Sequence, residues 1–159
     1  MGDFHFTCDR DIQYLISCEK IFSNPPKRPV FSERDITQRF EVYSKAENLK
    51  FNIFIAYSAR LPQDFSLGLM YDGFLLIRCN GYHGTTRNGY FNGSNHHAYP
   101  HAHLLTMDDI ENGRGKKPSH IEDMSGHYMN LLTAEAYFFN RCNILNAERY
   151  FDIAQLSLF

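Results

Sequence analysis

The sequence predicts an α+β fold, with an antiparallel β-sheet of about five strands flanked by an N-terminal and a C-terminal helix, in a single domain spanning residues 1–159. Three observations predict it. Apolar residues recur at helical spacing near both ends of the chain, they alternate with polar residues through its middle, and Asp72-Gly73 separates an alternating segment from an apolar one. A chain of 159 residues has the size of one domain and can bury a core without disulfides or metal.

The N-terminal helix is predicted over residues 7–22. Ile12, Leu15 and Ile16 fall on one face at the helical period, and the threonine at the start of the segment is suited to cap the first turn. We expect the helix to end before residues 23–29, because consecutive prolines in that segment cannot continue a helix.

Three segments show the alternation of polar and apolar side chains that is typical of half-buried strands, and two segments after them are predicted as further strands. A hairpin between the third and fourth segments is predicted from Asp72-Gly73, because both residue types tolerate the positive φ that a two-residue turn requires. A polar, glycine-rich loop over residues 80–95 precedes the fifth segment. The segments lie at residues 37–42, 51–57, 65–71, 74–79 and 99–105.

The C-terminal helix is predicted over residues 131–144, after a loop over residues 111–126 that is rich in Gly, Lys and Pro and that we expect to be mobile. Good helix formers and an apolar face predict the helix, and Asn143 is suited to a left-handed C-terminal cap. The predicted apolar face comprises Leu131, Leu132, Ala136 and Phe139.

Composition and charge exclude several classes of protein. The formal net charge of −2 predicts no global attraction to polyanions or to an acidic membrane. The apolar stretches are too short for a transmembrane helix, and the N-terminus lacks the features of a signal peptide. The four cysteines are scattered, without a CxxC pair. We therefore expect a reduced, cytoplasmic protein with no membrane partner.

Five of the eight histidines lie within residues 82–105, in the segment YHGTTRNGYFNGSNHHAYPHAHLL. His101 and His103 are two residues apart on the predicted fifth strand, so their side chains point to the same face, about 6 to 7 Å apart at the backbone. Histidine titrates near neutral pH, and two histidines can therefore serve as base and acid in one reaction. We predict that His101 and His103 transfer protons, assisted by His83 or His97.

The histidine segment and the loop after it contain groups suited to bind RNA. Arg87 would stabilise the charge that develops on a phosphate, because guanidinium binds phosphate oxygens in pairs. Bases would stack on tyrosines of the histidine segment, and the basic loop would clamp phosphates. These groups suit metal-independent RNA cleavage through the 2'-hydroxyl, without a cofactor. The predicted substrate-binding residues are Tyr82, Tyr90, Tyr99, Arg114, Lys116 and Lys117.

Other interpretations of the histidine segment stay open. In one, His101 and His103 bind a transition metal, although their spacing matches no established metal signature well. In another, the histidines are ordinary loop and edge-strand residues. In a third, the Tyr-, Asn- and His-rich loop belongs to a non-catalytic module that binds a protein or a ligand in phage defence or counter-defence. The further ligands in the metal interpretation would be His83, His96, His97 or Asp108.

An arginine-asparagine turn, a histidine pair and a P-H-x-H sequence follow one another in the histidine segment, at Arg87-Asn88, His96-His97 and residues 100–103. This order resembles the histidine-rich centre of TumE-type toxins from bacterial toxin-antitoxin pairs. A small related bacterial family of unknown function is similar in further positions, and the resemblance spans most of the chain. Those positions are Glu19-Lys20, Cys142-Asn143-Ile144 and Leu158-Phe159.

The resemblance implies a small bacterial or phage protein that acts on RNA or on the translation apparatus. It also implies a cognate antitoxin, encoded beside the toxin, that holds the protein inactive. RNA and this antitoxin protein are therefore the expected partners.

Overall fold

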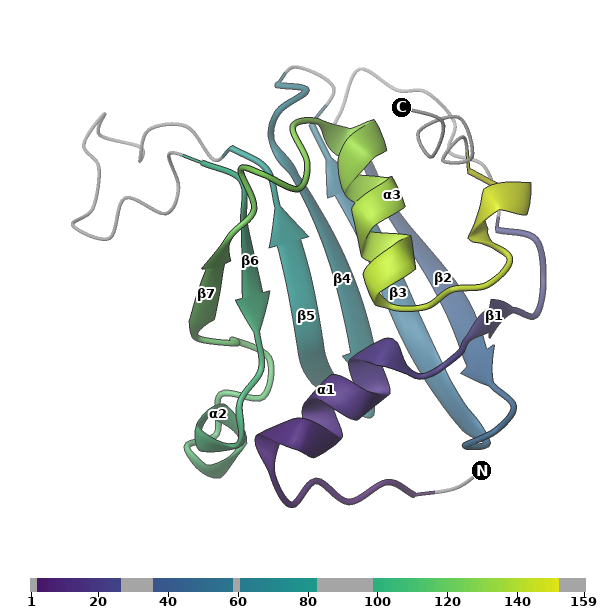
Figure 1. Cartoon of the computed structure of the whole chain (residues 1–159), viewed down its shortest axis with the longest axis vertical. Coiled ribbons are helices and arrows are strands. Elements are labelled where there is room, and N and C mark those ends of the chain that lie inside the picture. Colours follow the sequence, from purple (N-terminus) through teal and green to yellow (C-terminus); the bar gives the residue numbers. More distant parts are fainter. Residues whose placement is uncertain (1–2, 27–35, 59–60, 83–98, 152–159) are drawn as a thin grey trace.

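The computed structural model describes residues 3–26, 36–58, 61–82 and 99–151. In these ranges the chain forms a seven-stranded antiparallel sheet, and the order of the strands in the sheet is their order in the sequence (Figure 1). The strands are β1 (Ile21–Phe22), β2 (Ile36–Ser44), β3 (Leu49–Tyr57), β4 (Phe65–Tyr71), β5 (Phe74–Asn80), β6 (His101–Leu104) and β7 (His120–Asp123). The helices are α1 (Asp9–Ser17), α2 (Met107–Glu111), α3 (Leu131–Arg141) and the short 3-10 helix η2 (Ala147–Arg149).

The α+β class and the antiparallel sheet are confirmed, and the five predicted segments correspond to β2–β6. The number of about five strands is too low for the described residues. The sequence pattern does not reveal β1, because the two residues that form it look like the end of the N-terminal helix; that helix ends at Ser17, and Ile21 and Phe22 pair with β2. It does not reveal β7, because the mostly exposed residues of this edge strand lack apolar alternation.

Two local predictions of backbone conformation are confirmed. Asp72 and Gly73 join β4 to β5 with φ values of 46° and 81°, the positive φ that the predicted hairpin turn requires. Asn143, just after α3, has a φ of 55°. The apolar face predicted for α3 is partly wrong, because the buried residues are Ala134, Phe138 and Phe139, whereas Leu132 is 43% exposed.

α1 and α3 cover the same face of the sheet, and both lie in front of it in Figure 1. Their buried side chains, such as Leu15 and Phe138, join the inward-facing strand residues in one hydrophobic core. Because side chains alternate along a strand, the remaining strand residues point to the second face, on which no helix of the described ranges packs. The strand residues in the core include Val42, Phe51, Ile53, Ile55, Leu67, Leu69, Ile77, Cys79, Ala102 and Leu104.

Lys20 joins the C-terminal ends of α1 and α3. Its side chain is buried, and its Nζ donates hydrogen bonds to the carbonyl oxygens of Ile16 (2.8 Å), Cys18 (2.8 Å) and Cys142 (3.0 Å). The Lys20 backbone N–H also donates to the Asn143 carbonyl (3.0 Å). Glu19-Lys20 and Cys142-Asn143-Ile144, two sets of positions in the resemblance to the bacterial family, are therefore in contact at Lys20. Within the described ranges, no helix has the length and apolar character needed to cross a membrane.

Candidate functional site

Two rows of residues cross the second face of the sheet perpendicular to its strands. The register places Arg39 opposite Phe54, Phe54 opposite Gly68, Gly68 opposite Arg78, and Arg78 opposite His103; these residues are the Arg78 row. Two residues away along each strand, on the same face, the pairing produces a second row, the Asn80 row. Both predicted strand histidines therefore lie on this face, at neighbouring positions of β6. The Asn80 row consists of Thr37, Ala56, Ser66, Asn80 and His101, and it ends at Asp123 on β7.

His101 is completely buried and is held through both ring nitrogens. Its Nδ1 lies 2.9 Å from the Tyr99 carbonyl oxygen, and its Nε2 lies 3.2 Å from the Asn80 side-chain nitrogen. The Asn80 side-chain oxygen accepts a hydrogen bond from the Ser66 hydroxyl (2.7 Å). These partners assign the proton to Nδ1, which donates to the carbonyl, while Nε2 accepts from the amide. His101 is thus fixed as part of a hydrogen-bonded chain across β4, β5 and β6.

His103 lies beside His101 but closer to the surface, with 9% of its area exposed. The two ring centroids are 5.0 Å apart and the rings are nearly perpendicular, at 76°. This edge-to-face contact restricts the orientation of the His103 ring. The predicted pairing of His101 and His103 on one strand face is therefore found in the structure, but the environments of the two rings differ.

Arg78 brings a positive charge to His103, because the two residues are opposite one another on β5 and β6. The Arg78 Nε is buried and has no hydrogen-bond partner among the described residues. Burial lowers the pKa of this guanidinium from its usual value. A buried donor without an acceptor costs free energy, and an anionic ligand would supply the acceptor.

Sequence reasoning alone did not assign a role to Arg78, which interrupts the apolar run FLLIRC at residues 74–79. A charged residue inside an apolar run can indicate a functional position, and this feature could have drawn attention to Arg78. Its position beside His103 depends on the strand register, which the sequence pattern does not specify.

Tyr128, in the turn before α3, supports the site from the core side of the sheet. Its hydroxyl lies 2.8 Å from the Asn80 carbonyl oxygen and 3.0 Å from the His101 carbonyl oxygen. Burial raises the pKa of Tyr128, so the hydroxyl keeps its proton and acts as a donor. Tyr128 therefore ties β5 to β6 at the level of the Asn80 row.

The other residues predicted for the site are only partly brought together. Tyr99 is half-buried with its ring centroid 6.2 Å from that of His101, whereas Tyr82, just after β5, is 39% exposed. The remaining predicted residues of the histidine segment lie outside the described residues. They are His83, Arg87, Tyr90, His96 and His97.

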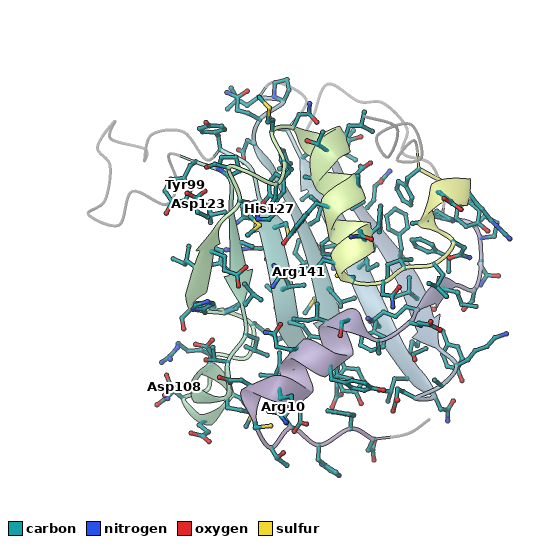
Figure 2. All side chains as sticks on the ribbon, in the orientation of Figure 1. Arg10, Tyr99, Asp108, Asp123, His127 and Arg141 are labelled. Carbon is teal, nitrogen blue, oxygen red and sulfur yellow. The ribbon has the colours of Figure 1, made fainter. Side chains whose placement is uncertain are left out.

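The basic loop predicted to clamp phosphates is not brought to the histidines. Arg114 forms ion pairs with Asp108 (3.0 Å) and Asp109 (3.2 Å), while Lys116 and Lys117 are exposed. The loop lies beside the start of β5, because the Gly115 carbonyl accepts from the Leu75 N–H, roughly 16 Å along the strand from Asn80. Figure 2 likewise shows Asp108 far from Tyr99, which marks the histidine end of β6. The segment predicted to be a mobile loop also contains β7.

Asp109 organises this loop from a buried position. Its carboxylate accepts from Thr106 N–H and hydroxyl, from Ser119 N–H and hydroxyl, and from the Arg114 Nε. Burial alone would raise the pKa of Asp109, but the hydrogen bonds from Ser119 and Thr106 hold it below the ordinary value of 3.8. The ion pairs of Arg114 therefore have a structural role in the loop.

We expect Asp109→Asn to lower the free energy of unfolding by about 2 kcal/mol at neutral pH, because an amide cannot accept all of these hydrogen bonds. A lowered pKa in the folded state means that the carboxylate stabilises the fold above its unfolded pKa and loses this effect as the pH falls through the folded value. Urea unfolding should therefore find a smaller difference from wild type near pH 3. Asp108→Asn, at a carboxylate that is 75% exposed, should change stability by less than about 0.5 kcal/mol. An equal Asp109→Asn effect at both pH values would contradict the assignment.

A transition metal at His101 and His103 would need ligands beyond these two. No group of three or more His, Cys, Asp or Glu side chains within the described ranges is arranged to hold a metal ion. A metal would also have to replace a hydrogen bond at one of the His101 nitrogens. Asp108, one of the further ligands considered from the sequence, is paired with Arg114 in the distant loop.

Comparison of the chain with protein-family models, with curated proteins and with solved structures finds no match. The geometry of the Arg78 row and the Asn80 row is therefore the basis for assigning a function.

Proposed function

We propose that this protein is a metal-independent endoribonuclease of the toxin type, acting in the cytoplasm. The observation that supports this most directly is the pairing of His103 with Arg78, whose buried Nε has no acceptor among the described residues. A side chain suited to proton transfer thus lies beside a cation suited to bind a phosphate oxygen. The hydrophobic core includes neither group.

In the proposed reaction, a base removes the proton of an RNA 2'-hydroxyl, and the oxygen attacks the adjacent phosphorus. The bond between phosphorus and the 5'-oxygen breaks, an acid protonates that oxygen, and the products are a 2',3'-cyclic phosphate and a 5'-hydroxyl. His103 is one of the two proton-transfer groups, and Arg78 stabilises the charge on the phosphate. The second group comes from the histidine segment, where His83 and His97, both outside the described residues, are the candidates.

For His101 we propose a role other than the proton transfer predicted from the sequence. Because it is buried and both ring nitrogens are hydrogen-bonded, we assign it as a positioning residue that fixes the His103 ring through their edge-to-face contact. Asn80, Ser66 and Tyr128 support it in turn.

The test is the effect of His103→Ala on RNA cleavage by the purified full chain and on growth and RNA integrity in expressing cells. We expect cleavage to fall at least about 100-fold, because a general acid or base contributes that much. Wild-type cleavage should continue in the presence of EDTA. His120→Ala, at an exposed histidine of β7, is the matched control and should cleave normally. Normal cleavage by folded His103→Ala would overturn the proposal.

A second candidate function is a non-catalytic binding module. It is favoured by the burial and complete hydrogen bonding of His101, which are equally typical of a structural histidine. This function predicts a stable complex, with a protein or a ligand, and no turnover. In that case the wild type and His103→Ala would both leave RNA intact. The cognate antitoxin implied by the resemblance is a proposed partner under either function.

A further inference from the structure

Phe54 occupies an unusual position in the Arg78 row. It belongs to β3, but its ring extends sideways over β4, into the space that a side chain at Gly68 would fill. A Cβ atom added to Gly68 would lie only 2.1 Å from the Phe54 Cε1 and 2.4 Å from its Cζ. Glycine at position 68 is thus required for this placement, which directs the ring toward β5 and Arg78. The ring is half-buried, so part of it is exposed on the second face.

The charges around Phe54 are positive. Arg39 lies on one side of it in the row, and Arg78 lies on the other side beyond Gly68. Among the described residues of the two rows, the acid is Asp123, which lies opposite His101 on β7 and accepts hydrogen bonds from the Ser125 N–H and hydroxyl. The nearest acid on this face of β2, Glu41, pairs with Lys50 at 2.9 Å. An aromatic ring with an arginine on either side of it in the row, and with Asp123 four strands away, complements a base with its flanking phosphates.

We propose that the Arg78 row binds single-stranded RNA, with one base stacked on Phe54 and the neighbouring phosphates bound by Arg78 and Arg39. This inference rests on the proposed function, because it names the substrate of the site that contains His103. Phe54 and Arg78 are two strands apart, about 10 Å at the usual strand spacing, a span that one nucleotide and the arginine side chain can bridge. A base must leave its duplex to stack on the ring, so the row selects single strands.

Binding is tested with Phe54→Trp in a His103→Ala background, so that the RNA stays intact. The chain contains no tryptophan, and the introduced residue therefore provides the whole indole fluorescence signal. A single-stranded RNA oligonucleotide should quench this signal in a saturable way, whereas the same sequence in a duplex should bind at least about tenfold more weakly. Tyr14→Trp in the same background is the control, because Tyr14 is exposed on α1, away from the second face.

Cleavage is tested with substitutions of Phe54 and Gly68 in the otherwise wild-type chain. Phe54→Leu should raise the KM for a single-stranded RNA about tenfold or more, while Phe54→Tyr, which keeps a stacking ring, should raise it several-fold less than Phe54→Leu does. Gly68→Ala should resemble Phe54→Leu, since the new methyl group displaces the ring.

The outcomes separate this inference from the proposed endoribonuclease function. Saturable quenching without any cleavage by the wild type would support RNA binding by the row and overturn the nuclease. Normal cleavage by Phe54→Leu, together with no quenching of Phe54→Trp, would overturn the stacking role alone. Equal binding of duplex and single strand would overturn the selection for single strands, and equal quenching of Tyr14→Trp would overturn the location. A single-stranded DNA of the same sequence should quench but should not be cleaved, because it lacks the 2'-hydroxyl.

Discussion

Lys20→Met is expected to lower the free energy of unfolding by about 3 kcal/mol, an effect large enough to unfold a marginally stable domain in part. The ammonium group has three N–H donors, and it directs them to the carbonyls of Ile16, Cys18 and Cys142 at 2.8 to 3.0 Å. These carbonyls belong to the C-terminal ends of α1 and α3, where the helix dipoles place negative partial charge. Methionine fills a similar volume but leaves all three carbonyls without this donor.

Burial makes this lysine sensitive to substitution. Only 1% of Lys20 is exposed, and its Nζ lies 4.8 Å from the centre of the Phe51 ring, so water cannot readily replace the lost hydrogen bonds. Burial also lowers the pKa of Lys20, but three carbonyl acceptors favour the charged form, because only an ammonium can donate to all of them.

The measurement is denaturant unfolding of the wild type, Lys20→Met and Lys50→Met. Lys50 is the matched control, since its side chain is 44% exposed and pairs with Glu41 on the surface; its replacement should change stability by less than about 0.5 kcal/mol. A Lys20→Met protein within about 1 kcal/mol of wild type would mean that the helix ends find other donors.

The predictable part of the fold is the part that depends on local pattern. β2–β4 follow from alternation, because one face of each strand contributes to a continuous core. The hairpin at Asp72-Gly73 follows from the conformations that these two residues tolerate. Lys20 could not be identified in this way, because its partners are backbone carbonyls, which every residue has, and one of them lies 122 residues away.

The candidate site was predictable to a smaller extent, for the same physical reason. The spacing of His101 and His103 is local, and it correctly placed both side chains on one strand face. The burial of His101 depends on Asn80 and the position of Arg78 depends on the register of β5 against β6, neither of which is a local property. The sequence therefore pointed to Arg87 for the phosphate-binding role that we propose for Arg78, and Arg87 lies outside the described residues.

Arg78→Met is expected to change stability and activity in opposite directions. The buried Nε of Arg78 has no hydrogen-bond partner among the described residues, and burial disfavours its charge. Methionine removes that unsatisfied donor and keeps most of the apolar stem, so we expect the free energy of unfolding to rise by about 1 kcal/mol. RNA cleavage should fall at least about 100-fold, because the charge on the phosphate loses its stabilising cation. A residue that lowers stability while supporting activity is a common feature of functional sites.

Arg141→Met is the matched control for this prediction, since Arg141 is a partly buried arginine that does have partners. Its Nη1 donates to Glu122 (3.0 Å) and to the Tyr137 hydroxyl (2.7 Å). Replacement of Arg141 should therefore destabilise the fold by about 1 to 2 kcal/mol, while His103 and Arg78 stay in place. Thermal unfolding and cleavage of single-stranded RNA are measured for both variants. If Arg78→Met were destabilised like Arg141→Met, Arg78 would be a structural residue. If Arg78→Met were stable and cleaved RNA normally, another cation would bind the phosphate, and Arg87 would be the candidate, as predicted from the sequence.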